Sequence, residues 1–228
     1  MRIRLLPKKA RRIYQEDGIV SLFIAARKYI RETTKKGAYQ KRRVDIEDRY
    51  EMISTYIDQS DSNLLDIGCA DGRLISKFNK EIDLFCIGID VSVSRINTAR
   101  VNFETEQDVG FILQDVTPTN IQKFPEFDIV LLLTVYHHWC RHFGIEKSEK
   151  MLDHLAKKSK KLFFEPPGRP IDDINIDDRQ YEDINRYYHT YLNSVFDETV
   201  EITHIGTARY MDGDRRDPIF FIDCESYN

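Results

Sequence analysis

Three acidic residues stand at or near the ends of three successive apolar runs in the first half of the chain. They are Asp66, Asp90 and Asp115. Parallel strands of an open α/β sheet bring their carboxyl ends to one edge, where folds of this kind bind ligands. The pattern therefore predicts that the three carboxylates share a ligand site.

A turn rich in small residues follows the first of these runs. Between Asp66 and Gly72 it contains Gly68, Cys69 and Ala70. Small residues let a ligand come close to the backbone, where a Cβ would collide with it. The turn resembles the first motif of class I S-adenosylmethionine (SAM)-dependent methyltransferases, acidic-x-Gly-x-Gly-x-Gly, with Ala70 in place of the middle glycine. The resemblance extends over about residues 49–224.

This resemblance implies a cofactor site for SAM at the turn. Asp66 is expected to order water or donors around the ammonium group of the methionine part. The residues expected to line that part are Gly68, Cys69, Ala70 and Gly72. Asp71 is expected to cap the helix that follows the turn.

Asp90 is expected to accept hydrogen bonds from both ribose hydroxyls, as an acidic residue does in dinucleotide enzymes. Val91 would then pack against the adenine. An alternative makes Asp90 the cap of the next helix, although Ser92 or Ser94 is better placed for that. The resemblance also implies that Asp115 accepts from the adenine amino group and that the backbone N–H of Val116 meets a ring nitrogen.

The run 127–133 predicts a buried parallel strand, because it is almost continuously apolar. In the family it resembles, the sulfonium methyl group and the acceptor meet at the carboxyl end of this strand. We therefore assign Leu133 and Thr134 to the cofactor site. The residues that follow form a candidate reaction centre: Tyr136, His137, His138 and Trp139.

A neutral imidazole takes a proton from an attacking hydroxyl, so His137 or His138 is the candidate base. Tyr136 is grouped with them as a catalytic candidate. Trp139 is assigned to substrate binding, since an aromatic ring shapes a pocket or faces a cationic sulfonium. Alternatively, one histidine caps the next element or packs in the core, and the sequence does not decide which.

Two further segments are expected to contact the acceptor. Glu165 and Arg169 follow the run 161–164 in a proline-rich loop and are assigned to a polar acceptor. The helical stretch 181–193 holds four pocket candidates, of which Tyr188 is preferred: Tyr187, Tyr188, His189 and Tyr191. Core packing of that helix is an equally good explanation of its tyrosines.

The remaining pattern predicts how these residues are positioned. Apolar runs and helical periodicity alternate, which implies a parallel sheet with helices on both faces. The expected helices are 44–58, 73–80, 93–103, 145–158 and 181–193, and the expected strands are 64–67, 84–89, 109–113, 127–133, 161–164, 199–205 and 218–224. The last two strands are adjacent and form a hairpin whose final strand inserts antiparallel. The predicted fold is a Rossmann-like, doubly wound, mostly parallel seven-stranded sheet.

The N-terminal segment differs sharply in charge from the rest. Residues 1–43 hold 14 Lys or Arg against 3 Asp or Glu, whereas the whole chain has a net charge of −4. Helical spacing of apolar residues predicts a basic amphipathic arm at 1–43, followed by the methyltransferase domain at 44–228. An anionic membrane surface is one partner for such an arm, RNA is a less favoured one, and packing on an acidic protein surface is the alternative.

Cysteine usage and hydropathy place the protein in the cytoplasm, with the inner membrane face as a second location. The four cysteines are scattered and suit buried free thiols. No apolar run has the length of a membrane span, and no convincing signal peptide is present. Cys140 with His138 and His142 does not suggest zinc, because alternate positions converge only on a strand and a fourth ligand is missing. We expect no metal.

Together these patterns predict a SAM-dependent methyltransferase. The favoured reaction is O-methylation of a sugar, a glycan or another small hydroxylated acceptor, including a lipid-linked one. The alternatives are an RNA methyltransferase and a non-catalytic SAM-binding scaffold, the latter suggested only by Ala70. The identity of the acceptor and the oligomeric state do not follow from the sequence.

Overall fold

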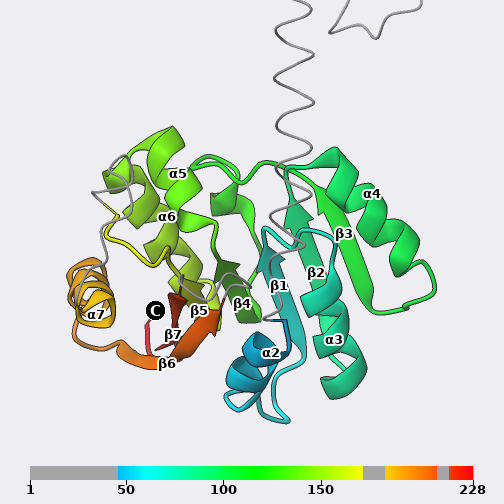
Figure 1. The fold of residues 1–228 in the computed structure, drawn as a ribbon, viewed down its shortest axis with the longest axis horizontal. Coiled ribbons are helices and arrows are strands. Elements are labelled where there is room, and N and C mark those ends of the chain that lie inside the picture. The colour runs from blue at the N-terminus through cyan, green and yellow to red at the C-terminus, as the bar shows by residue number, and fades with distance from the viewer. Residues whose placement is uncertain (1–45, 172–182, 210–215, 228) are drawn as a thin grey trace, which may run out of the picture. The chain divides into compact units, whose positions relative to one another are not determined.

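The computed structural model describes residues 46–171, 183–209 and 216–227 (Figure 1). The predicted basic arm at 1–43 lies outside the described residues. Among the described residues no helix combines the length and apolar character needed to cross a bilayer.

A single seven-stranded sheet organises the described part of the chain, with strand order β3-β2-β1-β4-β5-β7-β6. Its strands are β1 (Asn63–Ile67), β2 (Phe85–Asp90), β3 (Val109–Leu113), β4 (Phe127–Leu133), β5 (Ser159–Glu165), β6 (Glu201–Arg209) and β7 (Arg216–Asp223). Strands β1 to β5 pair in parallel, and β7 pairs antiparallel with both β5 and β6. The predicted fold, including the terminal antiparallel hairpin, is confirmed.

Helices cover both faces of this sheet. They are α2 (Ile46–Ser54), α3 (Arg73–Ile82), α4 (Val93–Asn102), α5 (Tyr136–Phe143), α6 (Ile145–Ala156) and α7 (Ile184–Val195), with a short 3₁₀ turn η2 (Ile121–Lys123). Leu64 packs with α2 and α3, whereas its neighbour Leu65 packs with the cluster that holds α5, α6 and α7. Successive residues of a strand point to opposite faces, so β1 is buried on both sides. In Figure 1, α4 lies beside β3 and α7 beside β6, at opposite ends of the sheet.

Two local predictions are corrected by the structure. Helix α5 was not among the expected helices; it forms here and buries Tyr136, Trp139 and Cys140. The N-cap of α3 is Gly72, in the left-handed conformation, and not Asp71. The Asp71 carboxylate instead accepts from Arg73 Nε at 3.1 Å.

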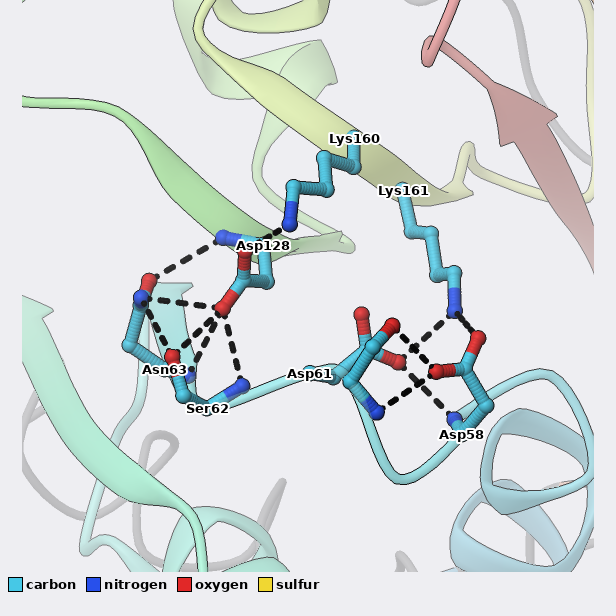
Figure 2. Close-up of polar contacts among 8 residues, drawn as sticks. Asp58, Asp61, Ser62, Asn63, Asp128, Lys160 and Lys161 are labelled. Atoms are coloured by element: carbon cyan, nitrogen blue, oxygen red, sulfur yellow. Dashed lines mark hydrogen bonds and ion pairs between the residues drawn. The ribbon is translucent and has the colours of Figure 1, made fainter.

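The amino edge of the sheet is held together by paired charges (Figure 2). Lys161, near the start of β5, reaches into the loop before β1 and binds Asp58 Oδ2 at 2.6 Å and Asp61 Oδ2 at 2.7 Å. Both lysine and Asp61 are buried. Hydrogen bonds from Lys161 and then Ser60 hold the pKa of Asp58 well below its usual range.

Asp128 fastens the start of β4 to the start of β1 at the same edge (Figure 2). Its Oδ2 accepts from the backbone N–H of Ser62 at 2.8 Å and of Asn63 at 3.2 Å. Lys160 Nζ lies 2.7 Å from Oδ1. Burial alone would raise the pKa of Asp128, but the hydrogen bonds from Lys160 and Ser62 outweigh it and lower the pKa to about 2.

Candidate active site

The turn after β1 follows an unusual backbone path. Gly68, Ala70 and Gly72 have φ values of 86°, 54° and 78°, all in the left-handed region. That region costs a non-glycine residue on the order of 1–2 kcal/mol. Ala70 nevertheless adopts it, so the departure from the glycine pattern leaves the path of the turn intact.

Neighbouring side chains close around the two glycines of this turn. A Cβ on Gly68 would lie 2.3 Å from Val135 Cγ2, and one on Gly72 would lie 2.5 Å from Phe111 Cε1. Both distances are far below van der Waals contact. These glycines therefore let the turn pack against Val135, two residues after β4, and against β3. The protein itself requires them, in addition to the expected approach of a ligand.

Asp90 ties the ends of β1 and β2 together. Its Oδ2 accepts from the backbone N–H of Ala70 at 3.1 Å, and its Oδ1 accepts from the backbone N–H of Ser92 at 2.7 Å. Ser92 is the N-cap residue of α4, so the alternative that made Asp90 the cap is wrong. Arg95 Nη1 lies 3.7 Å from Oδ2. A carboxylate has about four acceptor sites, so this one is fixed in orientation and retains capacity for further donors.

Asp66 is buried beneath the turn, with 5% of its surface exposed. No group within the described residues donates a hydrogen bond to its carboxylate. Burial raises the pKa of Asp66 to about 7; the charge of Arg49 opposes this rise and that of Asp90 adds to it. A cationic donor placed here would stabilise the ionised carboxylate.

Arg49, which the sequence did not single out, supplies the positive charge near Asp66. It extends from α2, is 5% exposed, and forms a buried ion pair with Glu165 at the end of β5. Ile46 and Ile53 flank it at spacings of three and four, so a charged residue stands within the apolar stripe of this helix. A charged residue within an apolar stripe is therefore the feature of the sequence that could have identified Arg49.

Glu165 is placed differently from the expectation of acceptor contact. Its side chain is 0% exposed and pairs with Arg49. Its backbone carbonyl accepts from the N–H of Thr134 at 2.8 Å, which fastens the exit of β4 to the end of β5. Because a fully buried side chain offers no surface to an acceptor, this geometry gives Glu165 a supporting position.

Tyr136 is also located in the core. It is 0% exposed, its hydroxyl lies 2.6 Å from that of Tyr191, and burial raises its pKa far above the usual range. A phenol in this setting stays protonated and supports the first turn of α5. Trp139 lies one turn further along the same helix and is 4% exposed. Both side chains therefore pack in the core beneath the candidate site and offer little exposed surface to a substrate.

His137 and His138 occupy the first turn of α5, directly beyond the carboxyl end of β4. Their rings lie 4.0 Å apart at 39°, with His137 half-buried and His138 exposed. Thr134, just before them, has a φ of 58°. A β-branched residue in the left-handed region is a genuine outlier, and such strain clusters at functional sites. The described residues contain no group of three or more His, Cys, Asp or Glu arranged to hold a metal ion.

Arg169 and Tyr188 meet in the loop beyond β5. Tyr188 is 0% exposed and its hydroxyl donates to the backbone carbonyl of Arg169 at 2.6 Å. The Tyr188 ring thus belongs to the core, as the alternative interpretation held, and its predicted substrate contact would need exposed surface that it lacks. The Arg169 side chain is half-buried, and together with burial its charge lowers the pKa of Arg141 on α5. The two guanidinium groups are therefore near enough to repel each other.

The predicted adenine-side residues lie at the ends of β2 and β3. Val91 is 68% exposed and Asp115 is exposed, whereas Val116 is buried. The side chain of Asn120 donates to the Asp115 carbonyl at 2.7 Å. Leu133 and Cys69 are buried beside the turn. The structure thus brings the ends of β1, β2, β3 and β4 to one edge, as the strand pattern predicted.

A comparison with known protein families agrees with this arrangement of strand ends. Residues 64–161 fit the model of a family described as a methyltransferase domain. The chain carries a methyltransferase domain. This match, together with methyltransferase structures that have SAH bound, confirms the predicted relationship to SAM-dependent methyltransferases and SAM as the cofactor of the domain. Free, buried cysteines at all four positions were also predicted correctly.

A relative and several solved structures resemble the chain. The O-antigen chain terminator bifunctional methyltransferase/kinase WbdD of Escherichia coli is 30% identical over 110 residues, 45% of this chain and 15% of WbdD. A WbdD structure matches with a TM-score of 0.63 at 20% identity, over 79% of this chain and 40% of that one. The plantazolicin methyltransferase BpumL in complex with SAH matches with a TM-score of 0.55 at 16% identity, over 82% and 88%. The domain thus spans well under half of WbdD, and at these identities the structural matches show the fold.

Proposed function

We propose that this chain transfers a methyl group from SAM to a hydroxyl group on a sugar of a surface glycan. The observation that carries this proposal is the placement of two adjacent histidines at the carboxyl end of β4. One is exposed, and both follow the strained Thr134. A base at this point faces the expected meeting place of methyl group and acceptor.

The residues at this edge fit SAM chemically. The cofactor offers an ammonium group, two ribose hydroxyls and an adenine amino group, all donors. Asp66 is buried without a donor among the described residues, Asp90 is fixed in orientation, and Asp115 is exposed. Val91 offers an exposed apolar surface for the adenine. When bound, SAM supplies a methyl group on a sulfonium that is already primed to leave.

The protein's own part is to position the acceptor and remove its proton. We assign the base to His138, because its ring is the more exposed of the two. Its neutral imidazole takes the proton of the attacking hydroxyl as the oxygen–methyl bond forms. His137 packs against it and limits its rotation. Arg169 is assigned to the polar groups of the acceptor.

The glycan class is supported by the name of the relative WbdD, an O-antigen chain terminator. We also assign the basic segment 1–43 to an anionic membrane surface, because its excess of Lys and Arg favours such a surface. The proposal includes a location in the cytoplasm, peripheral to the inner face of the membrane. An RNA acceptor remains the second candidate, since the same arm suits phosphates.

Labelling of a fractionated lysate with tritiated SAM tests the reaction and its acceptor class together. We expect label in the glycan or lipid-linked glycan fraction. His138→Gln should lower it by a factor of 10² or more, the usual worth of a general base. His142→Gln, on the same helix, is the matched control and should retain full labelling. Label confined to RNA would replace the glycan with the second candidate, and SAM binding without any label would favour a scaffold.

Flotation with anionic liposomes tests the role of the arm. The full chain should float at low salt, and deletion of residues 1–43 should abolish this while SAH binding is unchanged. Flotation that persists after the deletion would disprove the membrane role of the arm.

A further inference from the structure

One face of α7 lines a groove. The groove has a volume of 420 Å³, and its lining residues recur at helical spacing: Asp183, Arg186, Tyr187, Thr190, Tyr191 and Ser194. The opposite face of α7 carries Tyr188 and Leu192, which are fully buried. Helix α7 thus buries one face in the core, and the groove side forms a concave surface of ligand-binding size on which Tyr187 and Tyr191 also pack partly against the core.

Two tyrosine rings form the apolar part of the groove. Tyr187 and Tyr191 stand one turn apart with ring planes parallel to within 1° and centroids 6.4 Å apart. Both are partly exposed. Their hydroxyls point to protein partners: that of Tyr187 accepts from the backbone N–H of Ile171 at 3.2 Å, and that of Tyr191 meets Tyr136. With both ring orientations fixed in this way, the rings present a rigid surface.

Polar side chains complete the lining. Arg186, Thr190 and Ser194 are exposed on the same face. They offer a guanidinium and two hydroxyl groups, which donate to and accept from ligand hydroxyls. Aromatic rings with a few hydrogen-bonding groups beside them suit a ligand whose faces are carbon-bound hydrogens and whose edges are hydroxyls. A sugar ring has this surface.

The groove is also connected to the reaction centre. The hydroxyls of Tyr191 and Tyr136 lie 2.6 Å apart, and Tyr136 begins the helix that carries His137 and His138. Tyr188, between the two groove tyrosines, holds the backbone carbonyl of Arg169. The groove is therefore linked to the candidate reaction centre through buried tyrosines.

We propose that the α7 groove is a subsite for a sugar residue of the acceptor chain, remote from the sugar that receives the methyl group. This rests on the proposed function for the identity of the acceptor. The subsite explains how an enzyme that modifies one hydroxyl selects a glycan rather than a free sugar: binding at a remote residue orients the reacting one.

A pair of tryptophan substitutions on α7 tests the subsite. Thr190→Trp fills the groove, whereas Asn193→Trp adds the same side chain to an exposed position outside the lining. The full-length protein and both variants are applied to an array of neutral, acidic and phosphorylated bacterial oligosaccharides. SAH affinity is measured in parallel by calorimetry. We expect oligosaccharide binding by the wild type and Asn193→Trp, a loss of at least tenfold in Thr190→Trp, and equal SAH affinity in all three.

Each departure from this result has a distinct meaning. If the wild type binds SAH but no oligosaccharide, or if Thr190→Trp binds oligosaccharide like the wild type, the subsite is disproved while the cofactor assignment stands. Loss of a dimer in Thr190→Trp, seen by sedimentation, would identify the groove as an interface between copies and also disprove the subsite. Loss of SAH binding in the wild type with groove-dependent oligosaccharide binding would instead overturn the proposed function.

Discussion

The two edges of the sheet hold acidic side chains in opposite electrostatic settings. At the amino edge Asp58 and Asp128 are paired with Lys161 and Lys160, and their pKa values are lowered. At the carboxyl edge Asp66 is buried without a hydrogen-bond donor among the described residues, and its pKa is raised to about 7. The amino edge thus satisfies its own charges and stabilises the fold. The carboxyl edge retains an unsatisfied acceptor, at a cost in stability, as a ligand site does.

The largest expected effect is at the amino edge. Lys161→Met should lower the free energy of unfolding by about 3–5 kcal/mol, because it leaves the buried Asp61 carboxylate without its cation. SAH affinity of the folded protein should stay unchanged. Urea unfolding and calorimetry measure the two quantities. Lys158→Met, which breaks only the exposed pair with Glu126, is the control and should cost under about 1 kcal/mol. A weaker SAH affinity in Lys161→Met would mean that the two edges are not independent.

The opposite outcome is expected for Asp66→Asn. A carboxyl whose folded pKa is raised from 3.8 to about 7 destabilises the protein progressively as pH rises between those values, and fully above them. The amide avoids this cost, so the variant should be more stable at pH 8, by up to roughly 4 kcal/mol, and little changed at pH 4. SAH affinity should fall at pH 8, because the ammonium group loses its counter-charge. A variant that is less stable at pH 8 would show that Asp66 has a structural partner.

Asp128→Asn should show the reverse pH dependence, with a smaller effect. The folded pKa of Asp128 is lowered to about 2, so its ionised form stabilises the protein above the unfolded value near 3.8. The variant should lose about 2 kcal/mol at pH 7, and the difference should shrink as pH falls from 4 to 2. Thermal unfolding over this pH range measures it. A loss that does not vary with pH would assign the effect to hydrogen-bond geometry instead of charge.

These contrasts also show what the sequence could reveal. The strands were predictable because a buried parallel strand is a continuous apolar run, and β3 and β4 were predicted with their observed bounds. Acidic residues at or near the ends of such runs indicated which edge of the sheet would hold the candidate site, because parallel strands end at the same edge. The pairing of Arg49 with Glu165 joins residues 116 positions apart, which no local pattern encodes. Tyr136 and Tyr188 were uncertain because a tyrosine suits a core and a pocket equally well, and only the packing of α5 and α7 decides between them.

The smallest expected effect concerns the residue that departs from the glycine pattern. Ala70 holds a φ of 54°, which costs about 1–2 kcal/mol. Ala70→Gly removes that strain but adds roughly 0.4–1 kcal/mol of unfolded-state entropy, so the net change in stability should be a gain of less than about 1 kcal/mol. Because the backbone N–H of Ala70 already binds Asp90, SAH affinity and methyl transfer should be unchanged. Calorimetry measures the SAH affinity, and labelling with tritiated SAM measures methyl transfer. A large gain in either would show that alanine weakens the cofactor site and would support the scaffold alternative; equal values would remove the only feature of the sequence that favours it.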